Sequence, residues 1–268
     1  MPTLSTFVDV INRVLPEPHA GLLAGIVFGA KSSISTELYD ALIVTGTLHI
    51  AALSGMNITI LTKLFFSTFI LVLPRWVSSI LTIGVIVVFV LFVGPSPSVV
   101  RAAIMGSITL VAPLTGRIST ALITWGVTIA SMLLFDITLV GNISFQLSAL
   151  AALGMILFSK SSPSVTTEGN KFVAWVKEEL ATTLSAQVFT IPLILFTFGR
   201  ISLISPITNL LIGWTIPVIT VLGLCISLLG WIWLPLGQLL AWVTWVFLEW
   251  LIHVVLITST VPFASIGR

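Results

Sequence analysis

The feature that most constrains this chain is its long uninterrupted apolar runs, of which Trp76–Val93 is one. A helix that crosses the hydrocarbon core of a bilayer needs about 20 apolar residues, so a run of this length fits a membrane span. Backbone groups in lipid must be paired within one segment or around a closed barrel. The runs are continuous and lack the alternating pattern of a membrane β-barrel. They therefore predict membrane helices.

The composition supports this interpretation. Of the 268 residues, 57% are hydrophobic and only 7% are charged, whereas soluble domains carry about 25% charged residues. We therefore predict an all-α, polytopic integral membrane helical bundle with short interfacial or re-entrant helices. The net charge of +2 is too small to predict a broad basic surface for nucleic acid.

The apolar runs predict about seven to eight spanning segments. Pro206 and Pro217 interrupt one of them, Ser202–Leu229, which we expect to be a broken or hairpin element. One long polar connection is predicted at Lys160–Lys177. The expected spans are Met56–Leu73, Trp76–Val93, Val99–Leu114, Ser119–Phe135, Ile143–Ser159, Glu179–Phe198, Ser202–Leu229 and Leu236–Ser259.

The first 44 residues have a different pattern. Residues 20–30 are apolar but too few to span, which favours a re-entrant piece or the end of a broken span. Ser35–Val44 is amphipathic and suits a helix lying in the interface. We expect one membrane-embedded domain, in which residues 1–44 form an interfacial or re-entrant part and 45–268 form the bundle. A further short interfacial helix, ending at Pro16, is predicted from the helical spacing of Phe7, Val10, Ile11, Val14 and Leu15.

The polar segment LHIAALSGMNITILTK is the first place to look for function. A polar group without a partner in hydrocarbon costs roughly 4–8 kcal/mol, so polar residues at membrane depth usually face a bundle interior or a water-filled cavity. Ser54 and Gly55 stand where a helix can restart, and the N–H groups of a new helix start can hold an anion. The alternative is a tight helix contact that selects small residues. The other polar candidates here are His49, Asn57 and Lys63, whose ammonium group can also snorkel to the interface.

Further polar candidates lie in the later spans. Arg101 follows two prolines in the first turns of a helix, where it can bind a phosphate or snorkel. Gln146 shares a helix face with Asn142, and Gln187 shares one with Thr183. These side chains can line a hydrated lumen, or they can form interhelical hydrogen bonds worth about 0.6 kcal/mol each. Two more candidates complete the set, Arg200 and Asn209.

Motifs for self-contained metal or nucleotide chemistry are absent from the sequence. It contains no Walker A loop and no H-x-H or H-E-x-x-H pattern, and it has a single cysteine. The histidines, His19, His49 and His253, are far apart along the chain. We therefore predict no cofactor, no metal site and no catalytic residues.

Taken in order, five stretches resemble the membrane-embedded domain of the ComEC-type competence family, which takes up DNA. They occur in collinear order along the chain, so the resemblance extends from about Leu15 to Asn209. They are LPEPHAGLLAGIVFG (Leu15–Gly29), TGTLHIAALSGMNITIL (Thr45–Leu61), PSVVRAAIMGSITLVAPLTGR (Pro97–Arg117), GNISFQLSALAALGMIL (Gly141–Leu157) and SPITNLL (Ser205–Leu211).

The resemblance implies a channel in the bacterial cytoplasmic membrane through which single-stranded DNA passes during natural transformation. It points to His49, Ser54 and Gly55 in one motif, to Arg101 in a second and to Gln146 in a third. Asn57 departs from the family, because many relatives carry histidine there. Relatives also carry an OB-like region and a metallo-hydrolase-like domain that this sequence lacks. The chain is then either a stand-alone channel subunit or a fragment.

A channel for DNA implies several partners. These are single-stranded DNA, the lipid bilayer, separate nuclease or DNA-receptor and motor proteins, and further copies of the chain if one copy supplies too few cations. A second hypothesis is an intramembrane hydrolase with Ser54 as nucleophile and His49 or His253 as base. A third is a transporter of another solute, or a scaffold for the uptake machinery.

Overall fold

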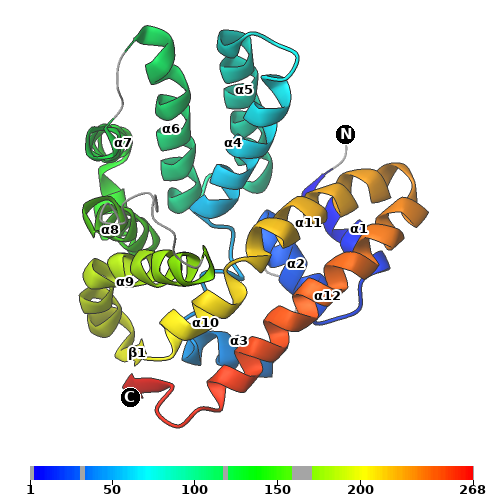
Figure 1. The fold of residues 1–268 in the computed structure, drawn as a ribbon, viewed down its shortest axis with the longest axis vertical. Coiled ribbons are helices and arrows are strands. Elements are labelled where there is room, and N and C mark those ends of the chain that lie inside the picture. The colour runs from blue at the N-terminus through cyan, green and yellow to red at the C-terminus, as the bar shows by residue number, and fades with distance from the viewer. Residues whose placement is uncertain (1–2, 31–33, 117–119, 159–170, 268) are drawn as a thin grey trace. The chain divides into compact units, whose positions relative to one another are not determined.

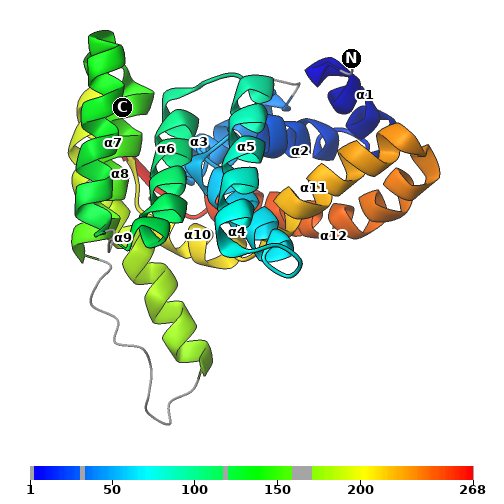
Figure 2. The same cartoon turned by 90° about the horizontal axis from the view of Figure 1, so that it is seen from above.

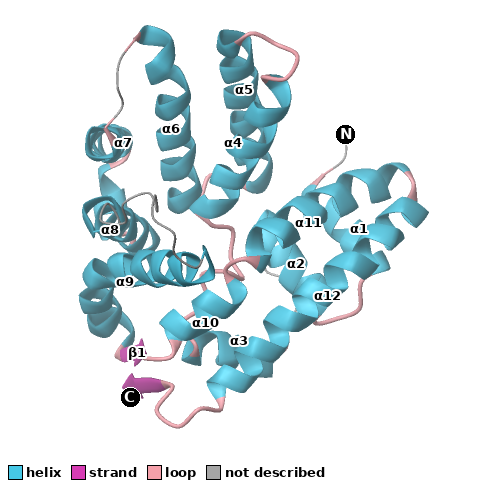
Figure 3. Cartoon of the chain, viewed as in Figure 1, coloured by secondary structure: helices cyan, strands magenta, loops and turns pink. Residues whose placement is uncertain are grey.

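The computed structural model describes residues 3–30, 34–116, 120–158 and 171–267, and in these ranges it is almost entirely helical (Figures 1 and 3). The predicted all-α class is confirmed. The chain divides into two compact units. Unit 1 comprises Met1–Asn57 and Gly199–Arg268, and unit 2 comprises Ile58–Phe198.

Unit 1 is built around a helical hairpin. Helices α11 and α12 run side by side, and α1 and α2 pack against them (Figures 1 and 2). Two short strands pair antiparallel, with Ile201 opposite Ile266. The elements are α1 (Leu4–Val14), α2 (His19–Phe28), α3 (Thr36–Val44), β1 (Arg200–Ser202), α10 (Ser205–Ile212), α11 (Thr215–Ile232), α12 (Leu234–Ser259) and β2 (Ser265–Gly267).

The predicted N-terminal helix is confirmed as α1. Its apolar residues recur every three or four positions, so they form one face, and that face is buried against α11, α12 and α2. The protein therefore covers the apolar face that was predicted to lie at a membrane interface. The helix gives way to extended backbone at Leu15, as expected for the residue before Pro16.

The short apolar run becomes α2, a helix of ten residues that are all buried. It ends at Gly29, whose φ of 67° is a conformation that favours glycine. A Cβ atom at Gly25 would lie 2.5 Å from the carbonyl oxygen of Ala51, and one at Gly29 would lie 2.9 Å from Cβ of Leu53. These two glycines therefore let the segment that precedes α4 (Gly55–Phe69) pack directly on α2.

The interrupted segment is broken, as predicted. It forms α10 and α11, which are separated at Gly213 and Trp214. Pro206 is the second residue of α10 and Pro217 the third of α11. Both prolines lie in a first turn, where no intrahelical N–H bond is lost. They therefore start helices and do not kink them.

Unit 2 holds the remaining helices. Helices α8 and α9 pack closely at Gly154. A Cβ atom there would lie 2.1 Å from the carbonyl oxygen of Ser185, so only glycine lets α8 approach α9 this closely. The elements are most of α4, then α5 (Arg75–Val93), α6 (Pro97–Val111), η1 (Ala112–Thr115), α7 (Ala121–Phe135), η2 (Ile137–Gly141), α8 (Ile143–Phe158) and α9 (Lys171–Phe198).

Each expected span contains a helix. The largest difference is at α9, which begins at Lys171 and not at Glu179, because an amphipathic stretch continues into the apolar span without a break. Most of the polar connection predicted at Lys160–Lys177 lies outside the described residues.

Five of the described helical segments are long and apolar enough to cross a membrane, so the chain is a helical membrane protein. Three shorter apolar helices accompany them, namely α2, α7 and α8. The long segments are Arg75–Val93, Pro97–Thr115, Val173–Phe198, Thr215–Ile232 and Leu234–Ser259.

Candidate functional site

The predicted site residues are shared between the two units. Six of them belong to unit 1 and four to unit 2. Unit 1 contains His49, Ser54, Gly55, Asn57, Arg200 and Asn209, and unit 2 contains Lys63, Arg101, Gln146 and Gln187.

The restart of the helix at Ser54 and Gly55 is confirmed. Residues 48–52 form turns and a bend, and α4 begins at Gly55. Ser54 is half-buried, and its carbonyl oxygen accepts a hydrogen bond from the Asn57 N–H group at 3.2 Å. In this part of the chain no described hydrogen bond joins the Ser54 hydroxyl to a histidine.

Asn57 is only 2% exposed, and it uses both ends of its amide inside unit 1. Its Nδ2 group donates to the Ile26 carbonyl oxygen on α2. Its Oδ1 atom accepts from the Thr220 hydroxyl on α11 at 3.3 Å. Asn57 therefore joins the start of α4 to two helices that are far away in sequence, and its place in a channel lining stays a prediction.

His49 lies in the turns before α4. Its Nδ1 group donates a hydrogen bond to the Gly46 carbonyl oxygen at 3.1 Å. The ring edge is accessible to solvent, but the surrounding protein desolvates the imidazole, and this lowers the pKa of His49. The hydrogen bond to Gly46 opposes that shift.

Arg101 is the predicted residue whose side chain links two helices of unit 2. It lies on α6 and is half-buried. Its Nε group donates to the Ser148 hydroxyl on α8 at 2.8 Å, and its Nη1 group lies 3.3 Å from the sulfur of Met105. These contacts use two of the five N–H donors of a guanidinium. No hydrogen bond of the other donors is described.

The other candidates of unit 2 are not joined to Arg101 by a described hydrogen bond. Lys63 is exposed on α4. Gln146 donates from Nε2 to the Val140 carbonyl oxygen at 2.6 Å, a local bond that fixes the start of α8. Gln187 is half-buried on α9. Their convergence on one lumen stays a prediction.

The last two candidates lie where unit 1 resumes. Arg200 is exposed in β1. Asn209 donates from Nδ2 to the Ser205 hydroxyl at 3.2 Å, within α10. The pairing of β1 with β2 places Arg200 opposite Gly267, whereas the described hydrogen bond of Asn209 stays within α10.

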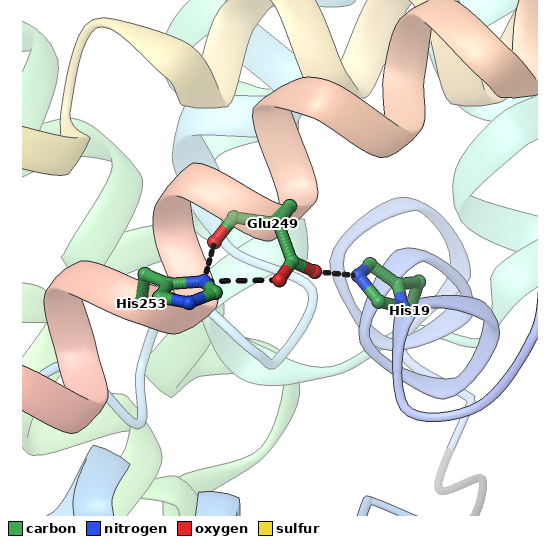
Figure 4. Close-up of polar contacts among 3 residues, drawn as sticks. All are labelled: His19, Glu249 and His253. Atoms are coloured by element: carbon green, nitrogen blue, oxygen red, sulfur yellow. Dashed lines mark hydrogen bonds and ion pairs between the residues drawn. The ribbon is translucent and has the colours of Figure 1, made fainter.

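A polar cluster that the sequence did not predict lies in unit 1 (Figure 4). The carboxylate of Glu249 on α12 has one oxygen 2.5 Å from Nε2 of His19 and the other 3.0 Å from Nδ1 of His253. His19 is buried at the start of α2, and its ring packs against Trp245. Two histidines that are 230 or more residues from each other in sequence therefore meet at one carboxylate.

The hydrogen-bond geometry of this cluster centres on Glu249. Nδ1 of His253 faces two acceptors, the Glu249 carboxylate and the Glu249 carbonyl oxygen at 3.2 Å. Nε2 of His19 faces the other carboxylate oxygen. Nδ1 of His19 is buried and has no hydrogen-bond partner among the described residues. A carboxylate in a span is costly unless partnered, and here both oxygens accept a hydrogen bond.

Among the described residues no group of three histidine, cysteine or carboxylate side chains is arranged to hold a metal ion. One signal for the polar cluster was in the sequence, because Glu249 and His253 are four residues apart on an apolar helix. His19 on α2 could not be predicted as a partner of Glu249 from sequence spacing, because only the packing of unit 1 brings α2 to α12.

Comparison with known proteins gives the family. The model of the family described as "Competence protein" matches residues 26–267, which include parts of both units. The chain belongs to the Competence protein family. The match begins within α2 and ends within β2, and it contains every predicted site residue. The resemblance inferred from the five sequence stretches is confirmed.

One curated relative illustrates the relationship within the Competence protein family. ComE operon protein 3 of Bacillus subtilis (strain 168) is 28% identical over 213 residues. That alignment covers 76% of this chain and 26% of the relative, so the chain spans about a quarter of the relative's length. No solved structure matches the chain.

Proposed function

We propose that this chain is a membrane component through which single-stranded DNA crosses the bacterial cytoplasmic membrane during natural competence. Membership of the Competence protein family supports the role in competence, and the five apolar helical segments support the place in a membrane. In this proposal residues 1–268 act as one membrane-embedded domain, in which 1–44 is the N-terminal part and 45–268 is the helical bundle.

The observation that carries the proposal is the position of Arg101. It is a half-buried cation on α6, a helical segment long and apolar enough to span a membrane, and Ser148 holds it against α8. Each nucleotide brings one negative charge, which cannot enter hydrocarbon without compensation. A guanidinium with unused donors binds a phosphate through paired hydrogen bonds. Conduction requires such contacts to be weak and repeated, so a few spaced cations suffice.

The surface of unit 2 supports a route shared between chains. Only 6% of the apolar segment Pro97–Thr115 is buried inside the structure, and 11% of Val173–Phe198. Those helices need lipid, water or another chain to cover them. Lys63 and Arg101 are the cations of unit 2 that we assign to the route, and a second copy or a partner would supply more. Nuclease, DNA-receptor and motor functions belong to separate proteins in this proposal.

The alternative hydrolase receives no support from the geometry. A serine nucleophile needs a base within hydrogen-bond reach. In the described residues His49 bonds Gly46 and His253 bonds Glu249, so neither histidine is directed to Ser54 by a hydrogen bond. The experiment below distinguishes the proposed DNA route from two other functions, a transporter of another solute and a scaffold.

The proposal is tested by reconstituting the purified chain in planar bilayers and recording current blockades by single-stranded DNA. We expect Arg101→Gln to lose most blockades and Arg101→Lys to keep part of them, because lysine retains the charge without the planar fork. The matched control is Arg75→Gln, which removes an exposed arginine at the start of α5.

Three outcomes would overturn the proposal. Blockades that are unchanged in Arg101→Gln would remove Arg101 from the route. Passage of small solutes without any effect of DNA would identify a transporter. A chain that gives no current, yet restores DNA uptake to cells as both wild type and Arg101→Gln, would identify a scaffold.

A further inference from the structure

A cavity of about 300 Å³ lies in unit 1 between α1 and the end of the α11–α12 hairpin. Gly230 forms part of its wall, and a Cβ atom there would lie 2.7 Å from Cγ1 of Val10. Glycine at this position therefore lets α1 sit close to the hairpin. The cavity is lined by Thr6, Asp9, Val10, Arg13, Gly230, Trp231 and Leu234.

The hairpin places this cavity at a membrane surface. Helices α11 and α12 are both long and apolar enough to span, and the chain reverses between them at Trp233. Trp231 is 50% exposed and Trp233 is 58% exposed. Exposed tryptophans are enriched at the level of the lipid headgroups. Helix α1 packs against the hairpin through its apolar face and leaves its polar face open.

The charged groups of the cavity are two opposite charges on one helix face. Asp9 and Arg13 are one turn apart on α1, and both are exposed. Neither takes part in an ion pair within the described residues. A simple anion is attracted by Arg13 and repelled by Asp9, and a simple cation meets the reverse. A ligand that carries a phosphate and an ammonium group together satisfies both side chains.

We infer that this cavity binds the headgroup of a zwitterionic phospholipid with a primary amine, the class represented by phosphatidylethanolamine. The Arg13 guanidinium takes the phosphate, and the Asp9 carboxylate accepts hydrogen bonds from the ammonium. A choline headgroup has no N–H to donate, so it leaves the carboxylate without that bond. Trp231 and Leu234 supply the apolar wall beside the glycerol and the first acyl carbons.

The test measures lipid retained by the full chain. The protein is taken from vesicles of equal parts phosphatidylethanolamine, phosphatidylcholine and phosphatidylglycerol, and bound lipids are counted by native mass spectrometry. We expect several-fold more phosphatidylethanolamine than phosphatidylcholine on the wild type. Asp9→Asn should abolish that preference and raise phosphatidylglycerol, and Arg13→Gln should lower all three lipids. The matched controls, Asp40→Asn on α3 and Arg75→Gln on α5, remove exposed charges outside the cavity and should change nothing.

Three results would overturn the inference. They are equal retention of the amine and choline lipids, a preference for phosphatidylglycerol that Asp9→Asn does not change, and no retained lipid at all. Both Asp9 and Arg13 are exposed, so their substitution leaves the core intact, and the reactivity of the single thiol, Cys225, checks the fold. No DNA is present in the assay, so its failure leaves the proposed DNA route untouched.

Discussion

The two units differ in how far they bury their own membrane helices. In unit 1, 44% of the apolar segment Thr215–Ile232 and 39% of Leu234–Ser259 are buried inside the structure. In unit 2 the corresponding shares are 28% for Arg75–Val93 and 6% for Pro97–Thr115. Unit 1 therefore covers its helices with its own elements, whereas unit 2 leaves most of that surface for lipid, water or another chain.

The polar groups follow the same division. In unit 1 the amide of Asn57 and the carboxylate of Glu249 have partners at both ends, so they hold the packing together. In unit 2 the described contacts of the Arg101 guanidinium are those of Nε with Ser148 and of Nη1 with Met105. We therefore interpret unit 1 as a scaffold and unit 2 as the part whose polar groups serve the proposed route.

The largest expected effect concerns the close packing of α8 on α9 in unit 2, the unit whose helices are less buried. Gly154→Ala puts a Cβ atom against a backbone carbonyl of α9, and we expect a loss of about 3 kcal/mol in the free energy of unfolding. Gly126→Ala on α7 is the control, because nothing lies within 4 Å of its Cβ position, and it should gain up to about 1 kcal/mol. Circular dichroism during unfolding measures both. Equal stabilities would show that α8 and α9 move apart freely.

The second prediction concerns the scaffold role of unit 1. Asn57→Ala removes two buried hydrogen bonds and leaves the Ile26 carbonyl oxygen without this partner, so we expect a loss of about 2 kcal/mol. Asn209→Ala, which loses one bond within α10, should cost less than about 1 kcal/mol. Thermal exposure of the Cys225 thiol on α11 measures both variants. A larger loss for Asn209→Ala would contradict the scaffold interpretation.

The third prediction concerns the histidine–carboxylate cluster. Glu249→Gln keeps the size of the side chain, but its amide group cannot accept from both His19 and His253, so we expect a loss of about 1–2 kcal/mol. Glu37→Gln, on an exposed position of α3, should stay within about 0.5 kcal/mol of wild type. The same thiol assay applies. A stabilised Glu249→Gln protein would show that the cluster does not hold α2 on α12.

The smallest expected effect is at the anchor of Arg101. Ser148→Ala removes one interhelical hydrogen bond, worth about 0.6 kcal/mol in membrane proteins. Ser144→Ala is the control, an exposed serine on the same helix. Unfolding followed by circular dichroism should barely separate the two. A loss above about 2 kcal/mol would make Arg101 part of the packing of unit 2 and would break the contrast between the units.

Helices were predictable from the sequence in the long apolar runs that fit a lipid environment. The span expected at Trp76–Val93 is α5, which begins one residue earlier at Arg75. Lipid requires every backbone group of such a run to be paired locally, so the sequence alone determines the helix. The start of α9 was missed because its first turns are amphipathic and polar, a pattern that does not depend on lipid.

The candidate site was predictable only in part. The helix restart at Gly55 and the place of Arg101 near the start of α6 follow from local signals, namely a glycine and two prolines. The Ser148 hydroxyl as the partner of Arg101 does not, because the two residues are 47 positions apart. The role of Arg101 in the DNA route is the proposal that the bilayer experiment tests.

The sequence by itself determined a membrane protein made of helices, the approximate position of each helix and the family. Only the tertiary structure decided that the Asn57 amide forms hydrogen bonds with α2 and α11, and that His19 and His253 both contact the Glu249 carboxylate. The physical reason is the range of the forces. Backbone pairing in an apolar solvent is set within one segment, whereas the partners of polar side chains depend on which helices pack together.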